Sequence, residues 1–177
     1  MQKNIRLQRA KSADGKRIYA HMEESFPREE LREYEDFYKV FNEEKNYAVY
    51  FLYDGAEEVG FIAVWSFPFF AFIEHFAVYP AFRGKNYGSA ALEEMKRRYS
   101  FLLLEIELPT EEIQIKRLRF YLRAGFQENG FYYEQPPYRK DGKPVPMKIL
   151  SYPAPVSDAQ ETVSVLYSAV YAREKDR

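Results

Sequence analysis

The segment over residues 78–89 carries the side chains and backbone groups with the clearest chemical potential. An apolar run over residues 70–78 predicts a strand, and a turn with one proline and two glycines follows it. Residues with helical spacing come next, so the turn opens a helix. The unpaired N–H groups at such a helix start, together with the positive end of its dipole, favour a phosphate or pyrophosphate. The segment therefore predicts an anion-binding loop.

Two common phosphate loops do not fit this segment. A P-loop requires Lys-Ser or Lys-Thr after its glycines, and the chain has neither there. The spacing of Gly84 and Gly88 also differs from that of a dinucleotide-binding loop.

The loop instead resembles the coenzyme A loop of the GNAT superfamily of N-acetyltransferases. That signature is Arg or Gln, two residues, Gly, one residue, then Gly or Ala, usually after Val-x-Pro. It aligns here with the residues from Arg83 to Gly88, preceded by Val78 and Pro80. Asn86 stands where the family usually has glycine, and asparagine tolerates left-handed backbone angles better than most residues.

A second segment resembles a later motif of the same superfamily. An apolar run over residues 101–108 predicts a strand, and a helix follows that ends at Gly125. Its last residues, Tyr121 to Phe126, are similar to the family's Tyr-x-x-x-Gly-Phe ending. The preceding Leu-Glu-Ile around Glu105 is similar to the Leu-Glu-Val strand of members that acetylate peptide N-termini. Those members carry Asn seven residues before the tyrosine, where this chain has Gln114.

The resemblance covers roughly residues 3–152 and implies an α/β fold with a central mixed, mostly antiparallel sheet flanked by helices on both faces. It implies that strand backbone binds the pantetheine arm of acetyl-CoA, the cosubstrate, and that the loop holds the pyrophosphate, with no metal. The residues implied to bind the coenzyme are Phe76, Ala77, Val78, Arg83, Gly84, Lys85, Asn86, Tyr87, Gly88, Ser89 and Gln114.

Acyl transfer from a thioester to an amine needs a base for the amine, stabilisation of the carbonyl oxygen and a proton for the leaving thiolate. Two carboxylates compete for the role of base: Glu74, just before the pantetheine-binding residues, and Glu105. Glu107 and Glu134 rank behind them. Neighbouring residues of a strand face opposite ways, so we expect His75 not to share a pocket with Glu74. The competing assignment for each carboxylate is a solvated strand side chain.

The resemblance assigns the proton donor to Tyr121. Gln114 and Tyr121 are seven residues apart, so on a helix they project from one face. We expect Ile115, Leu118 and Leu122 to face the core, which leaves the Tyr121 hydroxyl free to point towards the coenzyme sulfur.

Composition limits the other possibilities. A length of 177 residues predicts one domain, and 46% hydrophobic residues suffice for a sizeable core. A net charge of −1 gives no bulk reason to expect nucleic-acid or membrane binding. The absence of cysteine excludes thiolate catalysis and disulfides, and two histidines cannot form a metal cluster. With no bilayer-spanning apolar stretch and no signal-peptide core, we expect a cytoplasmic protein.

The remaining segments complete the predicted order. We expect a strand over residues 5–10, a helix over 14–26, a second helix that begins at Pro27, and a hairpin around Asp54-Gly55. A rigid loop over 131–146 precedes a strand over 147–152. The GNAT domain is predicted over 1–152, and the helix in 153–177 packs on this domain or forms a dimer contact, which leaves a monomer or homodimer open.

The sequence thus predicts an N-acetyltransferase that moves an acetyl group from acetyl-CoA to a small-molecule or peptide amine. The alternative is a catalytically silent acyl-CoA-binding module that acts as a sensor or partner subunit. The presence of both a carboxylate and Tyr121 favours the enzyme. Acidic residues near the expected entrance hint at a cationic acceptor: Glu23, Glu24, Glu29 and Glu30.

Overall fold

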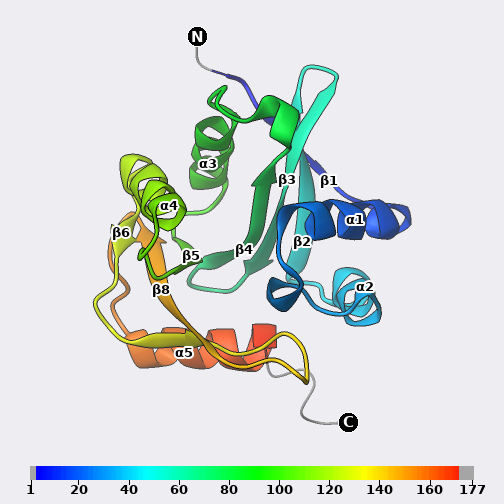
Figure 1. Cartoon of the computed structure of the whole chain (residues 1–177). Helices are drawn as coiled ribbons and strands as arrows, with labels where there is room; N and C mark the ends of the chain where they lie inside the picture. Colours follow the sequence, from blue (N-terminus) through cyan, green and yellow to red (C-terminus); the bar gives the residue numbers. More distant parts are fainter. Residues whose placement is uncertain (1–2, 172–177) are drawn as a thin grey trace.

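A mixed eight-stranded sheet forms the centre of the structure, a computed structural model that describes residues 3–171 (Figure 1). Its strand order is β1-β2-β3-β4-β5-β8-β6, with β7 paired to β8. The β4–β5 pair is parallel and the other pairs are antiparallel, which confirms the predicted mixed, mostly antiparallel sheet. The strands are β1 (Arg6–Arg9), β2 (Tyr47–Asp54), β3 (Glu57–Ser66), β4 (Ala71–Val78), β5 (Leu102–Glu107), β6 (Gln127–Glu128), β7 (Tyr133–Gln135) and β8 (Val145–Tyr152).

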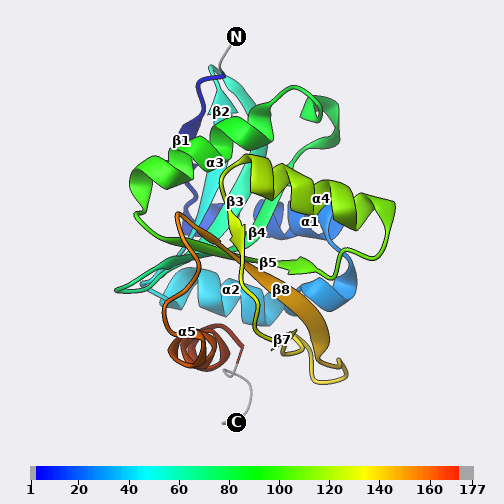
Figure 2. The same ribbon diagram turned by 90° about the vertical axis from the view of Figure 1, so that its left-hand side faces the viewer.

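Helices cover both faces of this sheet, as predicted (Figures 1 and 2). One face carries α1 (Gly15–Ser25), α2 (Tyr34–Glu43) and α5 (Ala159–Leu166). The other carries α3 (Tyr87–Arg98) and α4 (Glu112–Arg123). The apolar side chains of each strand alternate between the two buried clusters, because successive residues of a strand point to opposite faces. None of the helices within residues 3–171 is long and apolar enough to cross a membrane.

The segment after α1 differs from the prediction of a helix that begins at Pro27. Pro27 precedes a short 3-10 turn over Arg28–Glu30, and α2 starts later, at Tyr34. Leu31 is extended, with φ −124° and ψ 141°, because its side chain is buried in the core. The Leu31 carbonyl accepts a hydrogen bond from Arg139 Nε at 2.8 Å. Tertiary contacts of the segment therefore override its helical spacing.

The inward face of α4 also differs from the prediction. Leu122 is 40% exposed, whereas Leu118, Phe120 and Tyr121 pack against the core on that side of the sheet. The helix has no fully buried residue among those described, so the layer that it forms on this face of the sheet is partly open to solvent. The ring of Tyr121 therefore packs on the inward face of α4, whereas we expected the core to be formed without it.

The C-terminal segment packs on the same sheet. Asp158 caps α5 by accepting a hydrogen bond from the backbone N–H of Glu161 at 2.9 Å. The chain continues as a π-helical turn over Tyr167–Tyr171, where Val170 and Tyr171 are buried in the cluster that α1 and α2 also cover. The predicted loop over 131–146 contains the short strand β7, and residues 172–177 lie outside the described part.

Candidate active site

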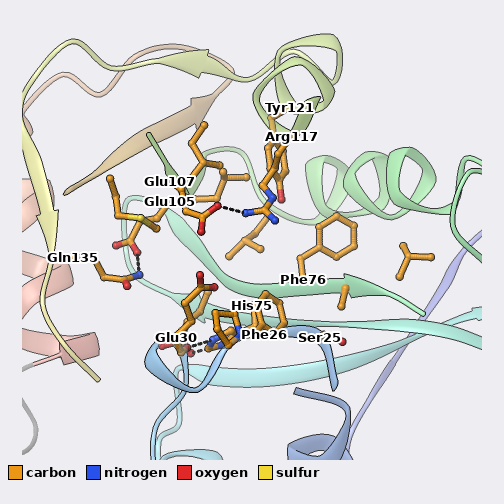
Figure 3. Close-up of a pocket in the computed structure, with 18 of the residues that line it drawn as sticks. Ser25, Phe26, Glu30, His75, Phe76, Glu105, Glu107, Arg117, Tyr121 and Gln135 are labelled. Atoms are coloured by element: carbon orange, nitrogen blue, oxygen red, sulfur yellow. Dashed lines mark hydrogen bonds and ion pairs between the residues drawn. The ribbon is translucent and has the colours of Figure 1, made fainter. Parts of the chain in front are cut away.

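The strands β4 and β5 separate partway along their length. They pair in parallel from Ala71/Leu102 to Ile73/Leu104, and beyond that point β4 pairs with β3 and β5 pairs with β8. The opening between them leads into a cavity of about 380 Å³, shown in Figure 3. A cleft of about 510 Å³ between β4, α3 and α4 adjoins this cavity, since five residues line both: Phe76, Val78, Arg83, Arg117 and Tyr121. The two hollows form one continuous path across the edge of β4.

A β-bulge in β4 corrects the predicted orientation of His75. Ala63 pairs with His75 and the next residue, Val64, pairs with Ile73, so Glu74 has no partner of its own in β3. The extra residue interrupts the alternation of the strand. The side chains of Glu74 and His75 consequently lie on the same side of the sheet and line the same cavity, with His75 Nδ1 3.7 Å from Glu74 Oε2.

Glu74 is held in a buried ion pair. Its side chain is 0% exposed and lies 2.7 Å from Arg32, which is 7% exposed. The Tyr138 hydroxyl donates a second hydrogen bond to it at 3.2 Å. Burial alone would raise the pKa of Glu74, but the charge of Arg32 and the His75 ring outweigh it and hold the pKa at about 2. A carboxylate this acidic is a poor proton acceptor at neutral pH.

Glu105 has the opposite electrostatic environment. Three side chains donate hydrogen bonds to its carboxylate: Tyr133, Gln135 at 2.5 Å and Tyr171 at 2.7 Å. Burial raises its pKa to about 7 even though these donors lower it, and the negative charge of Glu74 adds to the rise. The Tyr171 hydroxyl shares its one proton between the two oxygens, so three donated protons meet about four lone-pair sites and leave room for one more proton.

The predicted coenzyme loop has the backbone that an anion site needs. Gly84 and Asn86 both have positive φ, 73° and 65°, which confirms that asparagine adopts the left-handed conformation there. Asn86 is the N-cap of α3, so the first N–H groups of that helix face the cleft without helical partners. At Gly88 a Cβ atom would lie 3.1 Å from the Phe120 ring, so a small residue lets α4 approach. Arg117 and Arg123 line the cleft and add positive charge.

Tyr121 stands where the cavity and the cleft meet. Its ring packs edge-on against Phe120 and Phe126, with centroids 5.1 and 5.7 Å apart, and its hydroxyl points into the cavity (Figure 3). Burial raises its pKa to about 12, against a smaller opposing effect of Arg117. The phenol therefore keeps its proton at neutral pH and acts as a hydrogen-bond donor.

Other predicted site residues lie apart from these hollows. Gln114 Oε1 accepts hydrogen bonds from the Thr110 and Glu111 backbone, both at 3.0 Å, and so caps the N-terminus of α4. Lys85 Nζ donates to the Ala81 carbonyl at 2.9 Å, within the loop itself. The Glu134 side chain accepts from Tyr132 at 2.5 Å and does not line the cavity.

The remaining predicted residues lie at the hollows. Glu107 lines the cavity but pairs with Arg117 at 2.8 Å. Tyr87, Gly88 and Ser89 line the cleft, and Ala77 lines the cavity.

Sequence reasoning missed the residues that set the state of the two carboxylates. Arg32 lies in the segment predicted as helix, and the chain gives no local signal of its contact with Glu74. Tyr133 and Gln135 are two residues apart, which is the spacing of side chains on one face of a strand. That alternation could have predicted β7 and the two donors together, whereas nothing near Tyr171 points to Glu105.

Comparison with known proteins decides the family of this fold and site. The profile of the acetyltransferase (GNAT) family matches residues 15–126. A solved structure from Bacteroides thetaiotaomicron, assigned to the same family, is 32% identical, with a TM-score of 0.87 over 94% of this chain and 98% of that one. The chain belongs to the GNAT acetyltransferase family. No curated protein matches it.

Two more distant GNAT-like structures share the fold. The ribosomal-protein-S18-alanine N-acetyltransferase of Escherichia coli is 19% identical, with a TM-score of 0.59 over 88% of this chain and 97% of that one. An acetyltransferase of Bacillus subtilis, solved with CoA, is 15% identical, with a TM-score of 0.56 over 84% of this chain and 96% of that one.

Membership of the GNAT family fixes the general chemistry as acyl transfer, with acetyl-CoA as the typical cosubstrate. The residues around the separated strands fit that coenzyme: an open helix N-terminus and arginines for its phosphates, and an unpaired strand edge beside them for its arm. Within the described residues no group of three or more His, Asp or Glu side chains could hold a metal ion.

Proposed function

We propose that this GNAT family member transfers an acetyl group from acetyl-CoA to a primary amine by direct attack, with Glu105 as general base and Tyr121 as hydrogen-bond donor to the leaving sulfur. The observation that carries the proposal is the placement of a carboxylate with pKa about 7 in the cavity where β4 and β5 separate. A base is most effective when its pKa lies near the working pH.

We assign groups to coenzyme binding, to the base and to the leaving sulfur. Acetyl-CoA supplies the acetyl group as an activated thioester. The backbone of Phe76, Ala77 and Val78 has a free edge for the pantetheine arm, because β4 has no β5 partner there. Glu105 removes one proton from the ammonium, and the neutral amine nitrogen forms a bond to the carbonyl carbon. The carbon–sulfur bond then breaks, and the second proton that the nitrogen loses goes to the departing sulfur.

The Tyr121 hydroxyl donates a hydrogen bond to the departing thiolate. Because the pKa of this phenol is about 12, complete proton transfer to a thiolate is uphill, and a hydrogen bond that stabilises the developing charge is the main contribution. Glu74 stays ionised against Arg32 and shapes the cavity wall. We therefore choose Glu105 over Glu74 as the base, and we leave Gln114 out of the coenzyme site.

The test combines binding with turnover. Acetyl-CoA should raise the melting temperature of the protein by mass action, and an amine library should reveal acceptors that release free coenzyme A. General acid–base groups contribute ~10²–10⁴-fold, so Glu105→Gln should slow turnover by about that factor. Tyr121→Phe, which deletes only the hydroxyl, should slow it by at least about tenfold with coenzyme affinity unchanged.

The outcomes separate the enzyme from the alternative. A melting-temperature shift with acetyl-CoA and no turnover of any amine would favour the silent acyl-CoA-binding module. The absence of any shift at saturating acetyl-CoA would refute coenzyme binding and with it the proposed reaction. Full activity in Glu105→Gln at neutral pH would remove Glu105 from the role of base.

A further inference from the structure

The cavity has an acidic end away from the coenzyme cleft. Four carboxylates line the cavity and none of them lines the cleft: Glu30, Glu74, Glu105 and Glu107. Glu74 is paired with Arg32, and Glu107 with Arg117. The Glu30 side chain has no hydrogen bond or ion pair in the part of the chain that the structure describes, although it is half-buried. A half-buried carboxylate without a partner is unfavourable in the ligand-free protein.

The side-chain N–H and O–H groups that line this end of the cavity already have acceptors. Tyr138 donates to Glu74, and Gln135 donates to Glu105. His75 Nε2 lies 2.8 Å from the backbone carbonyl of Glu30, which can only accept, so Nε2 carries the proton and donates it. Hydrogen-bond acceptors therefore dominate the polar surface that is left for a ligand.

Two polar atoms beside the cavity are deeply buried. Glu74 Oε2 and His75 Nδ1 have no hydrogen-bond partner in residues 3–171, and their side chains are 0% and 4% exposed. The 3.7 Å between them exceeds a hydrogen bond. Buried polar atoms are normally hydrogen-bonded, so an unsatisfied carboxylate oxygen beside the cavity favours a ligand that donates hydrogen bonds. This observation is independent of the number of carboxylates.

Glu30 and Glu107 lie on opposite sides of the cavity (Figure 3). Burial raises the pKa of Glu30, and the like charge of Glu107 raises it further, whereas His75 and Arg117 act in the opposite direction. A cation between the two carboxylates would relieve this repulsion.

We propose that this end of the cavity is a subsite for a second ammonium group of the acceptor. The acceptor class is then an aliphatic diamine, or a larger amine with a positive charge besides its reacting nitrogen. One nitrogen is acetylated near Glu105 while the other stays protonated near Glu30. The inference rests on the proposed acetyl transfer and adds a substrate class to it.

Two probes of equal length test the subsite: 1,4-diaminobutane and n-butylamine, which differ by one amine. In the wild-type protein kcat/KM should favour the diamine by roughly tenfold, beyond the statistical factor from its two equivalent amines, because the second charge is held in a partly desolvated site. Higher salt should reduce the preference. Glu30→Gln should lower kcat/KM for the diamine more than for butylamine and bring the ratio close to the statistical factor.

Glu29→Gln is the matched control, because Glu29 is the exposed neighbour of Glu30 and does not line the cavity. It should keep the wild-type preference. Equal kcat/KM for both amines in the wild type, or an equal loss for both amines in Glu30→Gln, would overturn the subsite.

A binding measurement separates this inference from the proposed function. If neither amine releases coenzyme A, the acetyl transfer fails for these acceptors, and the subsite is judged by the melting temperature with desulfo-coenzyme A present. The diamine should then raise that temperature more than butylamine does, and Glu30→Gln should remove the difference. Equal shifts with the two amines would overturn the subsite without any reference to turnover.

Discussion

The hydroxyl of Tyr171 should set the pH at which the enzyme becomes active. It donates to both carboxylate oxygens of Glu105, at 2.9 and 2.7 Å, from a segment 66 residues further along the chain. Burial and the facing Glu105 raise the pKa of Tyr171, so the hydroxyl keeps its proton across the working range. A donor of this kind stabilises the ionised carboxylate and lowers its pKa. Tyr171→Phe should therefore raise the pKa of Glu105.

The size of the effect follows from the hydrogen bond. A hydrogen bond to a charged group contributes about 1.5–3 kcal/mol, which corresponds to a pKa rise of about 1–2 units. The wild-type carboxylate, with a pKa of about 7, is about half ionised at pH 7. In the variant, between about a tenth and about a hundredth of the Glu105 carboxyl groups would be ionised at pH 7. The kcat/KM at pH 7 should therefore fall about 5- to 50-fold.

The assay is kcat/KM across pH, which reports the ionisation of the free enzyme. Glu105 becomes protonated and stops acting as a base as pH falls through its pKa. The fall of kcat/KM at low pH (the acid limb) should therefore be centred near pH 7 in the wild type and move to higher pH in Tyr171→Phe. Activity should recover at alkaline pH, where the carboxylate is ionised in both proteins. Tyr133, Gln135 and Glu74 also face Glu105 and stay unchanged.

Tyr167→Phe is the matched control. Its hydroxyl donates to the Glu134 carbonyl at 2.5 Å, one helical turn before Tyr171, and makes no hydrogen bond to Glu105 within the described residues. This variant should keep the wild-type acid limb. An unmoved limb in Tyr171→Phe, or an equal shift in both variants, would refute the assignment of Glu105 as the base held by Tyr171.

Two further predictions use paired variants. Glu74→Gln leaves Arg32 buried without a counter-charge and should cost about 3–5 kcal/mol of unfolding free energy, whereas Glu107→Gln breaks a pair whose side chains are 34% and 46% exposed and should cost at most about 1 kcal/mol. Urea denaturation measures both, and equal losses would contradict the buried pair. Gly88→Glu places a carboxylate at the start of α3 and should abolish the melting-temperature shift with acetyl-CoA. Gly84→Ala, where a Cβ meets nothing within 4 Å, should retain the shift despite the backbone strain at φ 73°, and a retained shift in Gly88→Glu would contradict the anion site.

The order of strands and helices was largely predictable because its signals are local. Alternation and apolar runs gave β2 to β5, and Gly55, with φ 61°, forms the expected hairpin turn. The failures occur where distant contacts override local preference. The segment 28–33 has helical spacing, but Arg139 binds its carbonyls and Arg32 reaches Glu74, so it forms a short 3-10 turn and then an extended stretch instead of an α-helix.

The site was predictable in part for the same reason. The predicted coenzyme loop is a local structure. The left-handed backbone conformation of Asn86 could be predicted from its residue type alone. The orientation of His75 could not be predicted, because a bulge depends on how two strands align rather than on the sequence of either one. Residue spacing also cannot decide whether Gln114 caps a helix or binds the coenzyme. In the structure it caps α4.

The sequence by itself determined which segments carry the chemistry: a strand, an anion-binding loop and helix, and a second strand with a glutamate, followed by Tyr121. These follow from periodicity, turn residues and motif spacing, all of which act over a few residues. Only the tertiary structure separates the pKa values of the two glutamates. Glu74 and Glu105 look alike in the chain, but Arg32 holds the first ionised, while burial among neutral donors raises the pKa of the second to about 7. A pKa depends on the charges and solvent around a group, and folding brings those from distant parts of the chain.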